Sequence, residues 1–236
     1  LVLLVDLWFL SHLADEVAAP VGQLLPIVWL GTFVIPVFAG TGVSVASQFM
    51  GAKQHALVVP AYMMNLALTV FMSICFGTAL RIFAPEIGRW MGLDQSLNAV
   101  AATYLGAMSG YFLFMGVLVA YNAVLSSRGM THWLMYSSFL LAGVNLALAS
   151  LFVLVFHWGL RSIVLASIIG VASAMALSVW LVHVKLRVRF YLKGAARDML
   201  GVLRPMMRIG IANAFEPFSY SAQQIVLSTM IIGLGV

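Results

Sequence analysis

The chain has 236 residues, of which 63% are hydrophobic and only 8% are charged, whereas soluble domains carry roughly 25% charged residues. This composition excludes a soluble globular protein and indicates an integral membrane protein. The net charge of +5 comes from basic residues that fall in alternate loops between apolar stretches. That placement is typical of a membrane protein and argues against a nucleic-acid-binding surface.

Six apolar stretches dominate the chain, and each exceeds the roughly 20 residues that a helix needs to cross a ~30 Å hydrocarbon core. They are 17–52, 54–80, 95–127, 129–160, 162–184 and 209–236, the last interrupted only by Glu216. The stretches are too long and too aliphatic for barrel strands, which alternate in units of ~10 residues. The sequence therefore predicts an all-α polytopic membrane protein.

About seven transmembrane helices are expected in chain order, the first of them truncated at residue 1. Their expected ranges are 1–13, 19–49, 56–82, 98–125, 132–156, 161–184 and 207–234. The loop 83–97 contains Pro85 and is long enough for a short interfacial helix. The spacing of Gly106 and Gly110, like that of the small residues 166, 170 and 174, predicts close helix packing.

The loop charges predict the orientation of the chain in the membrane. Basic residues gather near 53, 128 and 185–208, and the other loops hold most of the acidic residues. Because positively charged loops stay on the cytoplasmic side, the N-terminus is expected to be cytoplasmic. The segment 185–208 is expected to lie along an anionic leaflet.

The ends of the chain look cut, because it opens in apolar sequence, Leu1 to Val5, without an initiator methionine. We therefore expect the sequence to be a piece of a longer protein. The single cysteine, Cys75, excludes an intrachain disulfide.

Asp6 is the strongest candidate for a functional residue. It stands between Val5 and Leu7 in apolar sequence, and a carboxylate inside a membrane is expensive enough to indicate a function. Because desolvation disfavours its ionised form, such a group can hold a proton, release it when a cavity opens to water, or bind Na⁺ when ionised. The alternative is an interfacial residue near the end of a truncated helix.

Glu216 is the second candidate and lies next to Pro217. Proline removes a backbone hydrogen bond and often kinks a transmembrane helix, so that freed carbonyl groups can face a cavity. A carboxylate beside that kink can bind a cationic substrate or exchange a proton. The alternative is a residue near the cytoplasmic interface that pairs with Arg208 or Arg204.

Four neutral polar residues in or near the apolar stretches are further candidates. Asn145 is expected to make an interhelical hydrogen bond worth roughly 0.6–2 kcal/mol. Gln48, Asn65 and Asn122 are candidates for substrate contacts, although such residues more often join helices.

The histidines do not predict a metal site, because they are scattered near the expected helix ends on both sides of the membrane. They are His12, His55, His132, His157 and His183. No ligand spacing fits zinc, and no pairing of a nucleophile with a base is apparent. We expect neither an enzyme nor a bound cofactor.

Several local sequences together resemble a known transporter family. They are Val5-Asp6-Leu7-Trp8-Phe9, Gly40-Thr41-Gly42, Ser47-Gln48-Phe49-Met50-Gly51-Ala52, Ala102-Thr103-Tyr104-Leu105, Ser127-Arg128-Gly129-Met130-Thr131 and Arg208-Ile209-Gly210-Ile211-Ala212. In order and spacing this set resembles the multidrug and toxic compound extrusion (MATE) transporters of the multidrug/oligosaccharidyl-lipid/polysaccharide flippase superfamily. The resemblance runs from end to end.

The resemblance implies a fold of twelve helices in two six-helix lobes. Residues 1–184 would then be the N-lobe, 185–206 a basic cytoplasmic connector and 207–236 the first helix of the C-lobe. The resemblance further implies a monomer in the cell membrane, of the bacterial inner-membrane type, that would not transport without its second lobe.

The activity implied is secondary antiport: export of drugs or other amphipathic, often cationic compounds in exchange for H⁺ or Na⁺ by alternating access. Asp6, with Asn145 as its neutral partner, would couple the cation, and Glu216 would contact substrate. Some relatives carry an aspartate four residues after this asparagine, where the present chain has Ala149. A two-carboxylate site in the N-lobe is therefore not expected.

Two alternatives remain open. A lipid-linked oligosaccharide flippase of the same superfamily would line its cavity with cationic residues for a pyrophosphate, and no Lys or Arg lies well inside an expected helix. A seven-helix receptor or sensor would match the number of spans, but the cut ends and the basic connector oppose it.

Overall fold

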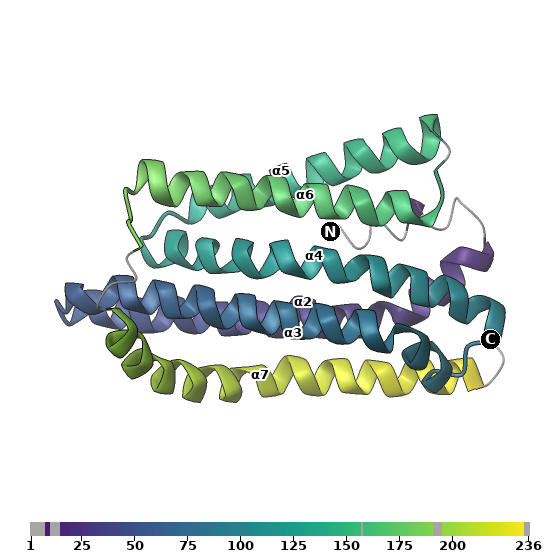
Figure 1. Cartoon of the computed structure of the whole chain (residues 1–236), viewed down its shortest axis with the longest axis horizontal. Helices are drawn as coiled ribbons and strands as arrows, with labels where there is room; N and C mark the ends of the chain where they lie inside the picture. Colours follow the sequence, from purple (N-terminus) through teal and green to yellow (C-terminus); the bar gives the residue numbers. More distant parts are fainter. Residues whose placement is uncertain (1–7, 10–14, 157, 191–194, 234–236) are drawn as a thin grey trace.

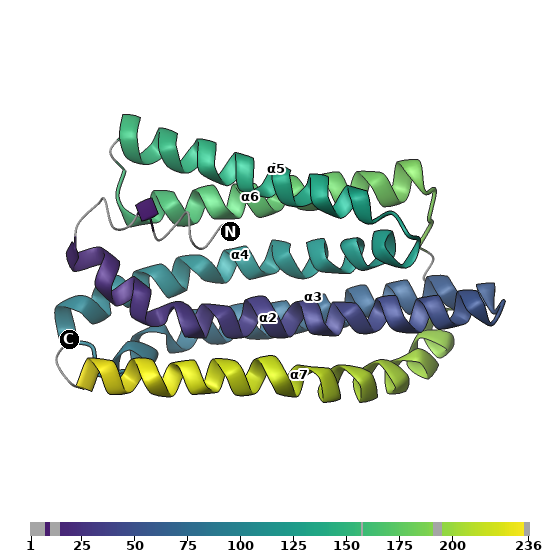
Figure 2. The same ribbon diagram turned by 180° about the vertical axis from the view of Figure 1, so that it is seen from behind.

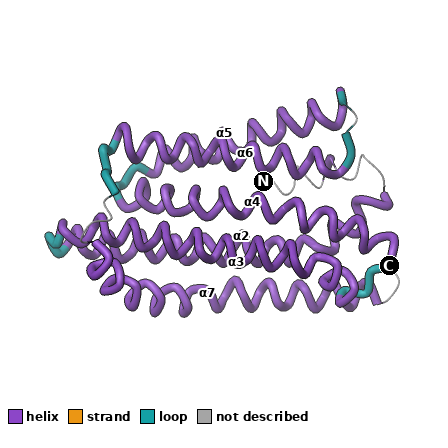
Figure 3. Tube along the Cα trace, viewed as in Figure 1, coloured by secondary structure: helices purple, strands orange, loops and turns teal. Residues whose placement is uncertain are grey.

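The computed structural model describes residues 8–9, 15–156, 158–190 and 195–233. Within these residues every regular element is helical (Figure 3). The expected first helix, and with it Asp6, lies outside the described residues except for Trp8 and Phe9. The all-α fold class predicted from the apolar stretches is confirmed.

Six long helices, α2 to α7, run side by side along one axis (Figures 1 and 2). They are α2 (Asp15–Gly51), α3 (Val58–Trp90), α4 (Gln95–Ser127), α5 (Thr131–Ser150), α6 (Leu160–Trp180) and α7 (Ala195–Gly233). A short 3₁₀ turn, η1 (His55–Leu57), precedes α3, and π-helical turns, η2 (Leu151–Val155) and η3 (Leu181–Lys185), extend α5 and α6.

Five of the described helical segments are long and apolar enough to cross a membrane. They are Val21–Gly51, His55–Trp90, Gln95–Ser127, Thr131–Val155 and Leu160–Lys185. The chain is therefore a multi-pass membrane protein, while the expected count of seven spans is not confirmed. Helix α7 is not among the five, because polar residues such as Asn213, Glu216, Gln223 and Gln224 interrupt its apolar sequence.

The connection between α3 and α4 is much shorter than expected. The predicted loop 83–97 is wrong, because α3 continues through Pro85 to Trp90 and α4 begins at Gln95. The amide Nδ2 of Asn98 donates a hydrogen bond to the carbonyl of Pro85 at 3.1 Å. This contact ties α3 to the next helix beside the proline, which removes one backbone hydrogen bond without ending α3.

Helix α4 lies at the centre of the bundle and contacts α2, α3 and α6. It buries Tyr104, Leu105, Met108 and Phe112 almost completely, and their spacing of one, three and four residues follows one face of a helix. Figures 1 and 2 both place α5 and α6 on one side of α4, and α2, α3 and α7 on the other.

Small residues set the distance between several helices, though not all of those expected. A Cβ on Gly170 would lie 3.0 Å from the carbonyl oxygen of Leu141, so α5 and α6 approach closely there. A Cβ on Gly106 would meet no atom within 4 Å. The prediction that Gly106 packs against a neighbouring helix is therefore wrong.

Gly116 of α4 is the clearest steric constraint between α3 and α4. A Cβ there would overlap the side chain of Ser73 and lie 2.9 Å from the carbonyl oxygen of Thr69. We expect Gly116→Leu to lower the free energy of unfolding by about 1–3 kcal/mol and the melting temperature by about 5–10 °C. Thermal unfolding in detergent measures the shift, and Gly106→Leu, which enters open space, is the matched control. Equal melting temperatures for the two variants would contradict this account of the α3–α4 contact.

Candidate functional site: a cavity between α2 and α7

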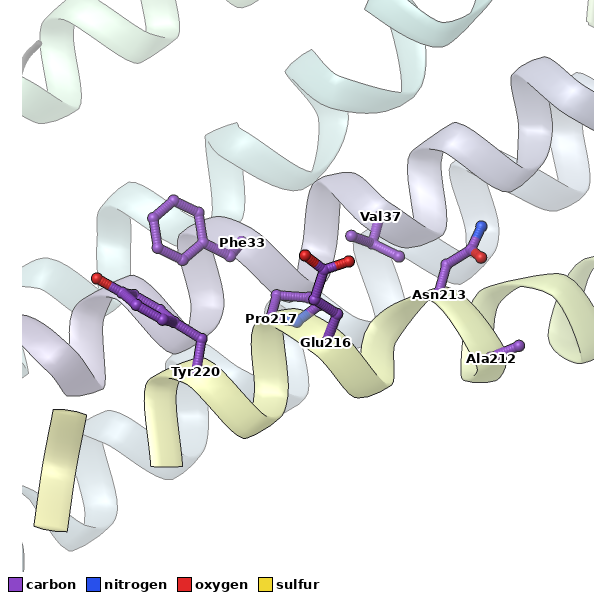
Figure 4. Close-up of a pocket in the computed structure, with 7 residues that line it drawn as sticks. All are labelled: Phe33, Val37, Ala212, Asn213, Glu216, Pro217 and Tyr220. Atoms are coloured by element: carbon purple, nitrogen blue, oxygen red, sulfur yellow. The ribbon is translucent and has the colours of Figure 1, made fainter. Parts of the chain in front are cut away.

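A cavity of about 840 Å³ lies between α2 and α7 (Figure 4). Helix α2 contributes Phe33 and Val37, which are four residues apart on one face. Helix α7 contributes the larger share of the wall, with residues at positions 212, 213, 216, 217 and 220. This spacing of three and four residues presents one face of α7 to the cavity.

Glu216 supplies the charge of this cavity. Its side chain is exposed, and Figure 4 shows the carboxylate pointing from α7 toward α2. Among the described residues that line the cavity there is no Lys, Arg or His. The described lining residues therefore carry a negative charge and no basic residue to neutralise it, which favours a cationic ligand.

Pro217 adds a backbone acceptor to the same wall. It lies inside α7 and has no N–H to donate to the carbonyl of Asn213, one turn earlier. Asn213 also lines the cavity through its side chain. The carboxylate of Glu216, the amide of Asn213 and the freed carbonyl thus place several oxygen acceptors on one face of α7.

Two aromatic rings complete the site. Phe33 of α2 is 43% exposed and Tyr220 of α7 is 48% exposed, and Figure 4 shows both rings at one end of the cavity. Aromatic faces attract cations by about 0.5–1 kcal/mol at exposed sites. A carboxylate beside two rings and Val37 is suited to a molecule that has a positive charge and an apolar body.

The packing of α2 against α7 closes one end of this region. A Cβ on Gly210 would lie 2.6 Å from Cδ1 of Phe38 and 3.2 Å from the methyl group of Thr41. Gly210 stands six residues before Glu216, toward the end of α7 that begins at Ala195. The two helices therefore touch directly at Gly210 and separate at Glu216.

Helix α5, which carries Asn145, lies on the other side of the bundle from α7 (Figures 1 and 2). Asn145 is fully buried in α5, and its Nδ2 donates to the hydroxyl of Ser167 in α6 at 2.8 Å. Ala149, one turn further along α5, is also fully buried. The interhelical hydrogen bond expected for Asn145 is present, while its role beside Asp6 stays a prediction.

The other polar candidates do not converge on the cavity. Gln48 is exposed at the end of α2. Asn65 is buried in α3 and packs against Gly42 of α2, leaving no room for a Cβ at that glycine. Asn122 of α4 accepts a hydrogen bond from Ser178 of α6 at 2.8 Å and lines a separate cavity of about 210 Å³.

Sequence reasoning found Glu216 and missed Phe33, Asn213 and Tyr220. The positions of Asn213 and Tyr220, three residues before and four after Glu216, were available as a signal, because such residues share a helix face. No local signal identifies Phe33, since it reaches the site only through the packing of α2 on α7.

The bundle of apolar helices defines a polytopic membrane protein with a charged, aromatic cavity between α2 and α7. Residues 1–151 match the protein-family model MatE. The chain therefore belongs to the MatE family, which confirms the resemblance seen in its local sequences.

The uncharacterized transporter YisQ of Bacillus subtilis (strain 168) is 26% identical over 243 residues, an alignment that covers 98% of this chain and 51% of YisQ. The chain thus spans about half the length of this curated relative. Together with the family match, this relative supports a membrane transporter.

Solved structures agree on the fold. The inward-facing conformation of a multidrug resistance MATE family transporter superimposes with a TM-score of 0.78 at 20% identity, covering 97% of this chain and 52% of that one. A transporter of the same superfamily from Pyrococcus furiosus gives a TM-score of 0.81 at 19% identity, covering 94% and 49%. At these identities the likeness concerns the fold alone.

Proposed function

We propose that the protein is a secondary active antiporter of the cell membrane that exports amphipathic, often cationic compounds in exchange for H⁺ or Na⁺. One observation carries this proposal: Glu216 stands exposed on the wall of the 840 Å³ cavity, with Phe33 and Tyr220 nearby. Such a site attracts a cation through the carboxylate and holds an apolar body on the rings.

The export step follows from the position of the cavity between two helices. Alternating access moves one part of a transporter against another around a site near the midplane. In the proposed twelve-helix protein, α2 belongs to the first lobe and α7 begins the second, so a movement between lobes changes the cavity that Glu216 faces. Binding of H⁺ or Na⁺ at Asp6 would then lower the affinity for the cationic substrate and release it.

Coupling to the ion gradient is assigned to Asp6, with Asn145 as a neutral partner. A carboxylate that alternates between a protonated and an ionised form changes the charge of its cavity by one unit. Each net charge that crosses 100 mV supplies about 2.3 kcal/mol, so the membrane potential helps the export of a neutral compound in exchange for H⁺ or Na⁺. One-for-one exchange with a monovalent cation moves no net charge and is driven by the concentration gradient of the ion alone.

The polarity of the cavity favours this cargo over a lipid-linked oligosaccharide. The Pyrococcus furiosus relative is described as having a binding pocket of reverse polarity, which suggests a different function for that protein. In the present cavity the charged group among the described lining residues is a carboxylate. A pyrophosphate would be repelled by it and would find no cationic partner there.

The proposal is tested with the natural full-length protein in sealed vesicles. A cationic dye is loaded, and a pH gradient or a Na⁺ gradient is imposed separately. Efflux that follows one gradient and stops when it is collapsed supports antiport and identifies the ion. An absence of gradient-driven efflux for cationic dyes, together with movement of a lipid-linked oligosaccharide between leaflets, would replace antiport by the flippase alternative.

A further inference from the structure

A second depression, of about 460 Å³, lies on a different part of the bundle, among α3, α4 and α6. It is lined by Arg81, Ala102, Thr103, Gly106, Ala107 and Arg161. None of these residues takes part in the α2–α7 cavity, and Figures 1 and 2 place α6 and α7 on opposite sides of the bundle. The transport proposal therefore leaves this depression without a role.

Two guanidinium groups line the same depression, one from α3 and one from α6. Arginine is always protonated in proteins, and none of the described lining residues is acidic. Nη1 of Arg81 donates to the carbonyl of Gly106 at 3.4 Å, which uses one of the five N–H donors of an arginine. Two like charges at one concavity favour an anion, and guanidinium forks match a phosphate group best.

The shape of the depression comes from small residues on α4. A Cβ on Gly106 would meet no atom within 4 Å, so this glycine leaves open space where a larger side chain would fill the hollow. Ala102 and Ala107 extend the same low surface. Gly106, which does not pack against a neighbouring helix, therefore leaves room for a ligand between the two arginines.

The depth of the depression in the membrane indicates where that anion resides. Arg161 is the second residue of α6 and stands at the start of the candidate span Leu160–Lys185, so we expect the hollow near the level of lipid headgroups. Below it the surface is apolar: Ile74 is 47% exposed and lies seven residues before Arg81 on the same face of α3, and Leu165 is 40% exposed, one turn after Arg161 on α6. Acyl chains can lie along both faces.

We infer that Arg81 and Arg161 bind the phosphate of a phospholipid headgroup, with the acyl chains of that lipid lying along α3 and α6. By the orientation expected from the loop charges, this lipid belongs to the outer leaflet. It joins three helices of the bundle at one point, through Arg81, Arg161 and the hollow at Gly106.

The test uses the natural full-length protein, stripped of lipid in detergent and titrated with phosphatidylglycerol under native mass spectrometry. We expect Arg81→Gln combined with Arg161→Gln to weaken binding at least about tenfold, since each arginine provides charge-assisted hydrogen bonds to the phosphate. Diacylglycerol, which has the chains without the phosphate, should bind wild type as weakly as phosphatidylglycerol binds the variant. Arg89→Gln, on exposed α3 surface outside the depression, is the matched control.

A second variant keeps both arginines and distinguishes loss of lipid binding from loss of the fold. Gly106→Leu fills the hollow and should also weaken binding of phosphatidylglycerol, while its melting temperature stays near that of wild type. Equal binding by wild type and both variants would overturn the inference, and so would diacylglycerol binding as tightly as phosphatidylglycerol. Displacement of the lipid by an equal concentration of inorganic phosphate would mean a site for a free anion instead of a lipid.

Discussion

Replacing Glu216 with glutamine is expected to raise the KM for a cationic dye about tenfold or more in the natural full-length protein. The change keeps the size of the side chain and removes the charge that faces α2 (Figure 4). A hydrogen bond to a charged group is worth about 1.5–3 kcal/mol, and tenfold in affinity corresponds to about 1.4 kcal/mol. Initial rates of dye efflux from vesicles at several dye concentrations measure the change.

The conservative variant Glu216→Asp should recover part of the affinity, because it restores the charge on a shorter side chain. Glu86→Gln is the matched control: it removes a carboxylate from α3 that does not line the α2–α7 cavity. The effect should also depend on the cargo, so a neutral amphipathic compound should lose far less than the cationic dye. An unchanged KM for the cation in Glu216→Gln would remove the carboxylate from the site.

Replacing Asp6 with asparagine is expected to uncouple efflux from the ion gradient. Asparagine can neither be protonated nor carry a charge, so the variant cannot exchange a proton or hold Na⁺ as a carboxylate does. A gradient of one pH unit is worth a factor of ten in the accumulation ratio, and we expect the variant to lose that factor. The ratio of dye across the membrane at steady state, with and without the gradient, gives the coupling directly.

Movement of dye down its own concentration gradient should persist in Asp6→Asn, because the α2–α7 cavity is unchanged. Asp94→Asn makes the same chemical change at an exposed residue just before α4, outside the spans, and should couple normally. A full response to the gradient in Asp6→Asn would move the coupling to another group, and Glu216 is then the carboxylate to examine.

The spans could be predicted from sequence because the thickness of the hydrocarbon core sets a minimum length for every apolar run. The ranges 98–125 and 161–184 fall within α4 and within α6 with its π-helical turn η3. The end of α3 could not be predicted, since a proline in sequence signals a break, whereas α3 continues through Pro85 to Trp90 and meets Asn98 of the next helix. Local sequence carries no information about that contact.

The candidate site was predictable only in part, for a similar reason. A carboxylate in an apolar stretch is unusual by itself, so Glu216 could be found without a structure. Asn65 and Asn122 are also polar residues in apolar stretches, yet their amides contact Gly42 and Ser178 and lie away from the α2–α7 cavity. Glu216 and the two asparagines differ in which face of their helix meets a neighbouring helix. That depends on packing between helices, which local sequence does not specify.

The contact of Gly210 with Phe38 marks a position where side-chain volume alone sets how closely α2 and α7 can approach. Because the two helices touch there without room for a methyl group, each added carbon acts as a wedge that favours states in which α2 and α7 are apart. A wedge shifts a population without altering any group that touches substrate or ion. In the proposed antiporter, a larger residue at this single glycine would therefore favour conformations in which α2 and α7 are apart, while the residues that line the cavity stay the same.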